Sequence, residues 1–140
     1  MLRQAQRRDL DAMMRIRKAV RENRLITRVI GAEEIIEQIE RSGRGWVFER
    51  DGEVVGFAIG NVLECNIWAL FVDPDHAASG VGRQLHDVML EWLWQQGLDS
   101  LWLSTDPGTR AERFYRRAGW RDCGIEAHGE VRFEMRRPAA

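Results

Sequence analysis

The chain has 140 residues and a mass of 16.2 kDa, which fits one domain with a single core. Hydrophobic residues make up 44% and charged residues 31%, a balance that excludes wholesale disorder. The formal net charge of −1 argues against a nucleic-acid partner, and no apolar run reaches the about 18 residues that a membrane helix needs.

The N-terminal part predicts a short strand and two helices. Residues 2–6 are a strand candidate, and a polar connection over residues 21–31 separates two helices that begin at Asp9 and Ala32. The second helix is expected to end at Glu40, before a break over residues 41–45. The N-terminus is charged without an apolar block behind it, so we expect no secretory signal and a cytoplasmic location. Apolar residues at helical spacing mark the first helix: Leu10, Met13, Ile16 and Val20.

The middle of the chain predicts three consecutive strands. Residues 46–50 and 53–59 flank Asp51-Gly52, which is typical of a two-residue hairpin turn because glycine tolerates positive φ. The third strand, residues 66–72, is apolar on both faces, which indicates a central position in a covered sheet.

The C-terminal half predicts a strand–helix–strand unit with parallel strands and a closing hairpin. A long helix over residues 80–96 leads to a strand at 100–104, and a short helix covers residues 109–117. Two strands near residues 120–125 and 130–135 close the chain. The predicted order is β-α-α-β-β-β-α-β-α-β-β, one α/β domain over residues 1–140 with a mixed sheet flanked by helices.

The turn between the third strand and the long helix is the first candidate site. Residues 73–82 hold two glycines directly before a helix, whose free N–H groups favour a phosphate or pyrophosphate. Glycines in such a place are also common as turn residues alone. Leu85 stands where a dinucleotide-binding motif needs its third glycine, and no Gly-Lys-Ser/Thr follows, so neither standard nucleotide motif is present.

Two motifs resemble those of the GNAT family of N-acetyltransferases, which transfer acetyl from acetyl-CoA to amines. The family has V-x-P followed by [Q/R]-G-x-G-x-[G/A], and here LFVDP runs into AASGVG. Its later block reads N-x-x-A-x-x-F-Y-x-x-x-G-F, and here it is GTRAERFYRRAGW. The predicted element order is also similar to that of the family, so the resemblance covers nearly the whole chain.

The resemblance implies an acetyl-CoA site in which pantetheine pairs with the third predicted strand and the pyrophosphate meets the helix N-terminus. A backbone N–H near Phe71 or Val72 would polarise the thioester carbonyl. The chain departs from the family pattern at Ala77, Ala78 and Gly108, where Gln or Arg, Gly and Asn are usual. The implied cofactor-binding residues are Leu70, Phe71, Val72, Ala77, Ala78, Ser79, Gly80, Val81, Gly82, Arg83 and Thr109.

The resemblance also implies direct attack of a neutral amine on the acetyl carbon, with Tyr115 protonating the departing thiolate. A buried aromatic with a structural role is the alternative for Tyr115. Glu64 is the first candidate for the base that removes the ammonium proton, Glu22 is the second, and a water relay is the third.

The substrate is expected between residues 22–31 and the hairpin at 126–130. Acids at Glu22, Glu64, Glu126 and Glu130 would favour a cationic amine, but scattered surface charges explain them equally well. The acceptor stays open between a small amine, such as an amino acid, a polyamine or an aminoglycoside, and a peptide or protein amine. Cys65 and Cys123 belong to no CxxC pair, so we expect no metal. An exposed tryptophan among Trp92, Trp94 and Trp102 would favour a homodimer, which the sequence leaves open. A non-catalytic acyl-CoA-binding or regulatory module on the same fold is the alternative function, and an interaction domain without cofactor is a further one.

Overall fold

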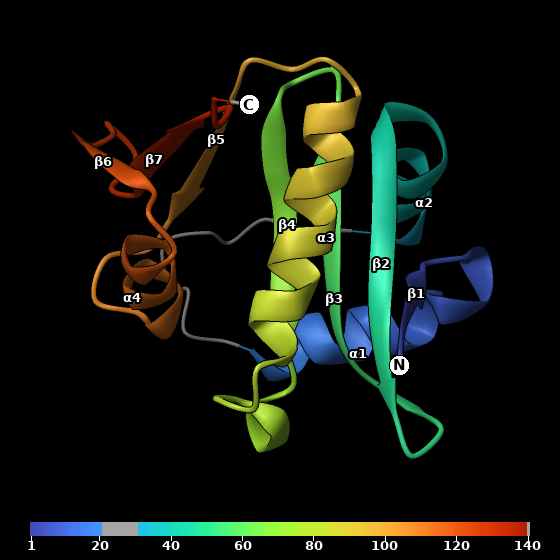
Figure 1. Ribbon diagram of the computed structural model, residues 1–140. Helices are drawn as coiled ribbons and strands as arrows, with labels where there is room; N and C mark the ends of the chain where they lie inside the picture. Colours follow the sequence, from blue (N-terminus) through green and yellow to red (C-terminus); the bar gives the residue numbers. More distant parts are fainter. Residues whose placement is uncertain (21–30, 140) are drawn as a thin grey trace.

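The computed structural model describes residues 1–20 and 31–139 and confirms the predicted order of strands and helices (Figure 1). No helix in these two ranges has the length and apolar character needed to cross a membrane. The elements are β1 (Leu2–Gln4), α1 (Leu10–Ala19), α2 (Ala32–Glu37), β2 (Gly43–Arg50), β3 (Glu53–Asn61), β4 (Asn66–Val72), α3 (Val81–Gln95), β5 (Ser100–Thr105), α4 (Arg110–Arg117), β6 (Arg121–Ile125) and β7 (Val131–Arg136).

The strands form one seven-stranded sheet in the order β1-β2-β3-β4-β5-β7-β6. All neighbours pair antiparallel except β4 and β5, which are parallel and connected through α3. The third predicted strand, β4, therefore lies in the middle of the sheet, as its apolar faces indicated.

Helices cover both faces of the sheet. In Figure 1, α3 crosses in front of β3 and β4, while α1 and α2 lie behind the sheet. Each face has its own core. The front core includes Leu85, Met89, Leu101, Tyr115 and Phe133, and the rear core includes Met13, Ile16, Ile35, Phe57 and Ile59.

The break expected at residues 41–45 is partly wrong, because Gly43 and Gly45 lie within β2. A Cβ on Gly43 would lie 1.7 Å from the carbonyl oxygen of Gly60, and one on Gly45 would lie 2.8 Å from a methyl of Ile39. These glycines permit close packing inside the sheet, where the sequence suggested a loop. The preceding helix also ends early, at Glu37, and continues as a wider turn over Gln38–Ser42.

The expected connection at residues 21–31 falls almost wholly outside the described residues. The other predicted boundaries differ from the observed ones by one or two residues. The hairpin turn at Asp51-Gly52 has φ of 54° and 78°, the two positive values that a type I′ turn requires.

Candidate active site

The two parallel strands at the centre of the sheet separate soon after they meet. They are registered at a single pair, Asn66 with Trp102, and the amide of Trp102 donates to the carbonyl of Cys65 over 3.0 Å. In the pairing of β4 with β3, Ile67 faces Gly60 and Ala69 faces Ile59, which makes Trp68 the extra residue of a β-bulge. A bulge bends the strand that contains it, so β4 leaves β5 from this point onward.

Backbone groups of β4 point into the opening. The amide of Asp73 donates to the carbonyl of Val55 over 2.8 Å, and Phe71 pairs with Phe57 two residues earlier. Because hydrogen-bonding direction alternates along a strand, Phe71 also faces β3, whereas Leu70 and Val72 present their N–H and C=O groups toward β5. Of the two amides expected to polarise a thioester, Val72 is the one that faces the gap.

Tyr115 of α4 lies at this gap. It lines a small cavity together with residues of β4 and β5, and is only 5% exposed. Burial raises the pKa of its hydroxyl above its usual range, so the phenol keeps its proton at neutral pH. The cavity is lined by Ile67, Trp68, Ala69, Leu70, Phe71, Leu103, Ser104, Thr105, Ala111 and Tyr115.

A buried histidine of α3 supports this tyrosine. The ring of His86 lies 6.4 Å from that of Tyr115, and its Nε2 accepts from Trp120 Nε1 over 3.0 Å. Its Nδ1 lies 2.9 Å from the carboxylate of Asp87, so the neutral ring has its proton on Nδ1. Burial lowers the pKa of His86, which favours this neutral form. No local pattern marks His86, since its burial depends on contacts of α3 with Phe114 and Trp120.

The loop from β4 to α3 brings the predicted pyrophosphate residues to the same end of the gap. The first hydrogen bond of α3 runs from the amide of Gln84 to the carbonyl of Gly80 over 3.2 Å. The amides of Val81, Gly82 and Arg83, which precede it in the helix, therefore have no helical partner. A Cβ on Gly82 would lie 3.5 Å from Val72 and 3.9 Å from Phe114. The helix N-terminus is therefore packed between the end of β4 and α4.

The rest of this loop is exposed or half-buried. Ala77 is half-buried, whereas Ala78, Ser79 and Gly80 are exposed. Ala78 and Gly80 have φ of 60° and 86°, so an alanine occupies a left-handed conformation at one of the positions where the sequence departs from the GNAT pattern. The Ser79 hydroxyl donates to the carbonyl of His76.

Thr109 is buried as the N-cap of α4. Its hydroxyl donates to the carbonyl of Asp106 over 2.8 Å and accepts from the amide of Glu112 over 3.2 Å. The carboxylate of Glu112 accepts from the amide of Gly108 over 2.8 Å, which completes the turn. The Thr109 hydroxyl is thus engaged within the turn, and its contact with a cofactor stays a prediction.

A larger hollow of about 270 Å³ opens on the rear face of the sheet. Leu101 and Leu103 of β5 point into the front core, so the alternating residues Trp102 and Ser104 face the rear. Ile67, Trp68 and Ser104 line both this hollow and the small cavity beside Tyr115. The hollow and the cavity therefore adjoin at the gap between β4 and β5. The hollow is lined by Asn66, Ile67, Trp68, Trp102, Ser104, Glu126, His128 and Glu130.

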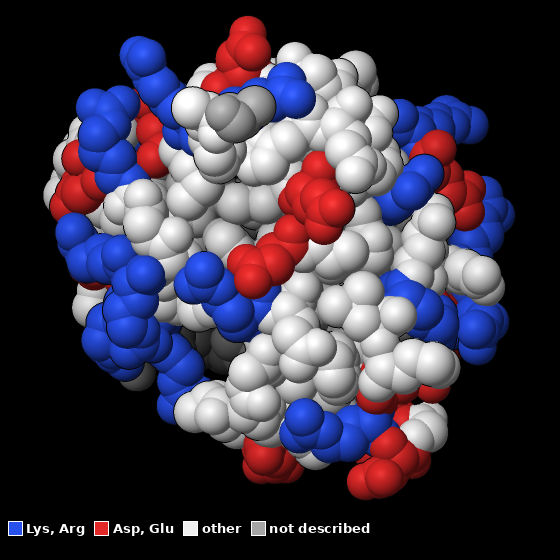
Figure 2. Space-filling view, in the orientation of Figure 1, with Lys and Arg blue, Asp and Glu red and all other residues white. Residues whose placement is uncertain are grey.

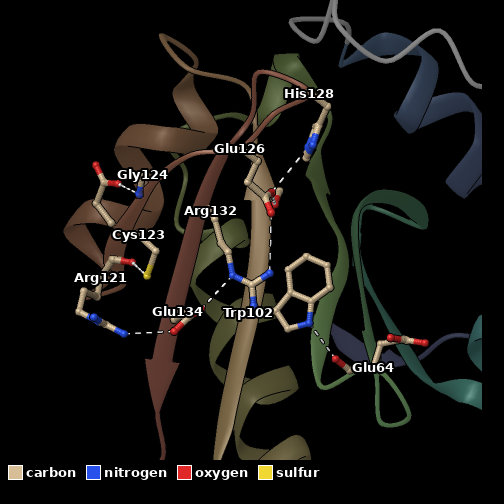
Figure 3. A network of polar contacts seen from close by, with 11 residues as sticks. Glu64, Trp102, Arg121, Cys123, Gly124, Glu126, His128, Arg132 and Glu134 are labelled. Carbon is tan, nitrogen blue, oxygen red and sulfur yellow. Dashed lines mark hydrogen bonds and ion pairs between the residues drawn. The ribbon is translucent and has the colours of Figure 1, made fainter.

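Figure 3 shows the polar groups of this rear face. The guanidinium of Arg132 lies 4.5 Å from the ring centroid of Trp102 and contacts the carboxylate of Glu126 at 3.8 Å. Glu126 also accepts from the hydroxyl of Ser104. His128 Nε2 lies 2.9 Å from a carboxylate oxygen of Glu130, whose side chain is 9% exposed. The expected substrate hairpin at residues 126–130 is therefore part of the wall of the hollow.

The first candidate base named from the sequence, Glu64, lies outside the hollow. Glu64 is exposed on the turn before β4, and its carbonyl accepts from Trp102 Nε1 over 2.8 Å. Figure 3 shows its carboxylate directed away from Glu126 and Arg132, and Glu64 is not among the residues that line the hollow. Glu22 lies outside the described residues. Cys65 and Cys123 are free thiols, and residues 1–20 and 31–139 hold no His/Cys/Asp/Glu group arranged for a metal.

Comparison with known proteins agrees with this geometry. The acetyltransferase (GNAT) family matches residues 10–120, which is most of the chain. The chain belongs to the GNAT family. The motif resemblance is confirmed at the level of family, while the roles of individual site residues stay predictions.

Curated relatives of this GNAT chain are acetyltransferases with different acceptors. A mycothiol acetyltransferase of Clavibacter sepedonicus is 35% identical over 82 residues, which cover 56% of this chain and 27% of the relative. The ribosomal protein bS18 alanine N-acetyltransferase of Escherichia coli is 29% identical over 79 residues, 54% of this chain and 53% of the relative. The matched segments thus span about half or less of these relatives' lengths.

Solved structures share the fold over almost the full chain. A PaiA N-acetyltransferase from Thermoplasma acidophilum, in complex with coenzyme A, has a TM-score of 0.83 at 13% identity and covers 98% of both chains. A ribosomal-protein-alanine N-acetyltransferase from Brucella melitensis has a TM-score of 0.81 at 21% identity, covering 97% of this chain and 99% of its own. At these identities the similarity establishes the fold alone.

Proposed function

We propose that the protein is an N-acetyltransferase that moves acetyl from acetyl-CoA to a primary amine by direct attack within a ternary complex. The observation that supports this most is the gap between β4 and β5, which meets a cavity on the front face and a hollow on the rear face. Acetyl-CoA would enter from the front, where Tyr115 and the N-terminus of α3 lie. The amine would enter from the rear and reach the thioester between the two strands.

The backbone fits an extended pantetheine arm as an added strand. Leu70 and Val72 present backbone donors and acceptors to the gap. Among the described residues no strand pairs with them on that side, because β5 is in register with β4 only at Asn66. The Val72 amide would donate to the thioester oxygen and stabilise the negative charge that develops on it during attack. The free amides of Val81, Gly82 and Arg83 would receive the pyrophosphate.

Tyr115 would complete the transfer. When the C–S bond breaks, the CoA thiolate needs a proton, and a phenol that stays protonated at neutral pH can supply it. The neutral amine attacks the acetyl carbon directly, so no acyl-enzyme forms. Glu64, the base proposed from the sequence, would have to act from outside the hollow.

Calorimetric titration with acetyl-CoA tests the cofactor site. We expect micromolar binding, and Gly82→Trp should weaken it at least about tenfold because the indole would fill the space before Val72 and Phe114. The matched control is Glu91→Trp, an exposed position farther along α3, which should bind normally. Normal binding by Gly82→Trp would place the cofactor elsewhere.

The competing proposal is a non-catalytic acyl-CoA-binding module. The left-handed Ala78 in the pyrophosphate loop favours it, since this residue departs from the family pattern. Release of CoA thiol with a panel of amines separates the two proposals. The panel contains an alanine-initiated peptide, chosen because two relatives are named for protein alanine acetylation, together with spermidine and an amino sugar. Tight acetyl-CoA binding without release for any amine would support the module.

A further inference from the structure

The rear hollow contains a buried carboxylate that the sequence did not single out as a base. Glu130 directly precedes β7, and its side chain points to the rear face of the sheet, as do the alternate residues Arg132 and Glu134. Its side chain is 9% exposed and accepts a hydrogen bond from His128 Nε2 over 2.9 Å. His128 is 54% exposed, so it connects the buried carboxylate with solvent.

The walls of the hollow suit a protonated amine. Trp68 and Trp102 both line the hollow, and cations are attracted to aromatic rings. The guanidinium of Arg132 already lies 4.5 Å from the ring centroid of Trp102, so Trp68 is the ring without such a contact among the described residues. Asn66 adds a buried side-chain oxygen that accepts no hydrogen bond from the described residues, and an ammonium N–H would satisfy it. Glu126 is already held by Ser104 and approached by Arg132, which leaves Glu130 as the carboxylate without a guanidinium contact among the described residues.

We propose that Glu130 is the catalytic base, that His128 is a positioning residue for its carboxylate, and that the hollow selects a cationic amine. This inference rests on the proposed N-acetyltransferase function and names the acceptor end of the same site. Glu130 lines the rear hollow, which shares Ile67, Trp68 and Ser104 with the front cavity proposed for acetyl-CoA. Glu64 lines neither the hollow nor the cavity.

The electrostatic surroundings of Glu130 favour this role. The charged groups that face it are Asp106 before α4, and Glu126 and His128 on its own hairpin. Burial raises the pKa of Glu130, and the negative charges of Asp106 and Glu126 act in the same direction, while His128 opposes them. A carboxylate with a raised pKa is a stronger base than an exposed one, which suits removal of a proton from an ammonium group.

The protons balance in this scheme. An ammonium nitrogen loses two protons when it becomes a secondary amide. One passes to the Glu130 carboxylate before attack and leaves through His128 to solvent. The other leaves the nitrogen after the new C–N bond forms, and replaces the proton that Tyr115 gives to the CoA sulfur as the C–S bond breaks. The net reaction releases one proton for each acetyl group transferred.

The test compares Glu130→Gln with Glu64→Gln and with Glu134→Gln, a matched control on β7 that pairs with Arg121 and Arg132 outside the hollow. Rates with the alanine-initiated peptide and with spermidine are measured from about pH 6.5 to 9.5, together with acetyl-CoA affinity. An α-amine has a pKa of about 8 and is neutral without help at the upper end, whereas the amines of spermidine stay largely protonated.

We expect Glu130→Gln to lower kcat for the peptide about 100-fold near pH 7, with acetyl-CoA affinity unchanged. The deficit for the peptide should shrink toward pH 9.5, and that for spermidine should persist. The control Glu134→Gln should keep the wild-type rate. Glu64→Gln tests the rival base and should show no pH-dependent loss. Should the amide variant not fold, Glu130→Asp, which keeps the carboxylate but withdraws it by one methylene, should show a smaller loss with the same dependence on pH.

Four results would overturn the proposal. A wild-type rate for Glu130→Gln near pH 7 would remove its role, and a deficit for the peptide that does not shrink toward pH 9.5 would make Glu130 structural. A pH-dependent loss in Glu64→Gln would assign the base to Glu64. If the wild-type protein binds acetyl-CoA but acetylates no amine of the panel, the N-acetyltransferase proposal fails and Glu130 with it, a result distinct from failure of Glu130 alone.

Discussion

At the scale of single residues, Tyr115 combines a packing role with the proposed catalytic one. Its ring lies 5.3 Å from Phe114 and 5.7 Å from Trp120, both in edge-to-face geometry. These contacts involve only the ring, so the hydroxyl is not needed for them and can act as the proposed proton donor at the gap. The two roles can therefore be separated by removing the oxygen alone.

We predict that Tyr115→Phe folds normally and lowers kcat by about 100-fold, because the ring contacts remain while the thiolate loses its proton donor. Acetyl-CoA affinity should change little. Steady-state kinetics and calorimetry measure the two effects. Unchanged turnover at every pH would leave Tyr115 with a structural role only.

Backbone strain at Ala78 gives a second prediction. A left-handed conformation costs a residue with a Cβ about 1 kcal/mol relative to glycine, so Ala78→Gly should raise the free energy of unfolding by a few tenths to about 1 kcal/mol. Ala77 has φ of −64°, and Ala77→Gly should lower stability by about 0.5 kcal/mol. Urea unfolding compares the two variants. Equal destabilisation by both would show that Ala78 is not strained.

The raised pKa of Glu130 predicts that its catalytic and stability effects have opposite signs. The folded state holds this proton more tightly than the unfolded chain, whose carboxyl titrates at its ordinary value of 4.5. Stability is therefore lost as pH rises from that value through the folded pKa. Glu130→Gln should raise Tm at about pH 8 and change it little at about pH 4. A lower Tm at the higher pH would mean that the carboxylate stabilises the hairpin.

At the scale of elements, the site depends on how α4 begins. This helix follows β5 directly and presents Tyr115 to the gap, and its first turn is fixed by Thr109, Gly108 and Glu112. The short length of α4, Arg110–Arg117, makes the cap a large part of its local stability.

Thr109→Ala should lower the free energy of unfolding by about 1 kcal/mol, since the amide of Glu112 and the carbonyl of Asp106 both lose a partner. The control Thr109→Ser keeps the hydroxyl and should lose less. Denaturant unfolding measures both variants. If the two lose equal stability, packing of the methyl group and not the cap determines the effect.

At the scale of the whole molecule, a net charge of −1 conceals a local basic surface. Figure 2 shows blue side chains gathered at the left, over the region of α4. Its exposed arginines are Arg110, Arg113, Arg116 and Arg117. Gly82 lies against Phe114 of the same helix, so this basic surface borders the proposed pyrophosphate site. The phosphates of acetyl-CoA would be attracted to it.

Acetyl-CoA affinity should therefore fall severalfold when ionic strength rises from about 0.05 M to about 0.5 M, because salt screens exposed charges. S-acetylpantetheine has no phosphate and is the matched ligand control, with an affinity that should not depend on salt. Calorimetry at the two ionic strengths measures both. Equal salt dependence for the two ligands would exclude an electrostatic contribution from the phosphates.

The sequence alone determined the order of elements, because each is encoded by local patterns. Alternating or unbroken apolar residues predicted the strands, three- and four-residue spacing predicted the helices, and Asp51-Gly52 predicted the hairpin turn. The motifs that contain Gly82 and Tyr115 identified the family for the same reason, since each is contiguous in the chain.

The tertiary structure alone decided which carboxylate is buried and which glycines lie inside the sheet. Gly43 reads locally as a break, and its place in β2 depends on the carbonyl of Gly60. Glu64 and Glu130 look alike as isolated acids, but Glu64 lies on an exposed turn, whereas Glu130 is buried in the β6–β7 hairpin, whose strand β7 pairs with β5. Burial and pKa depend on contacts between segments far apart in sequence, and no local pattern encodes those contacts.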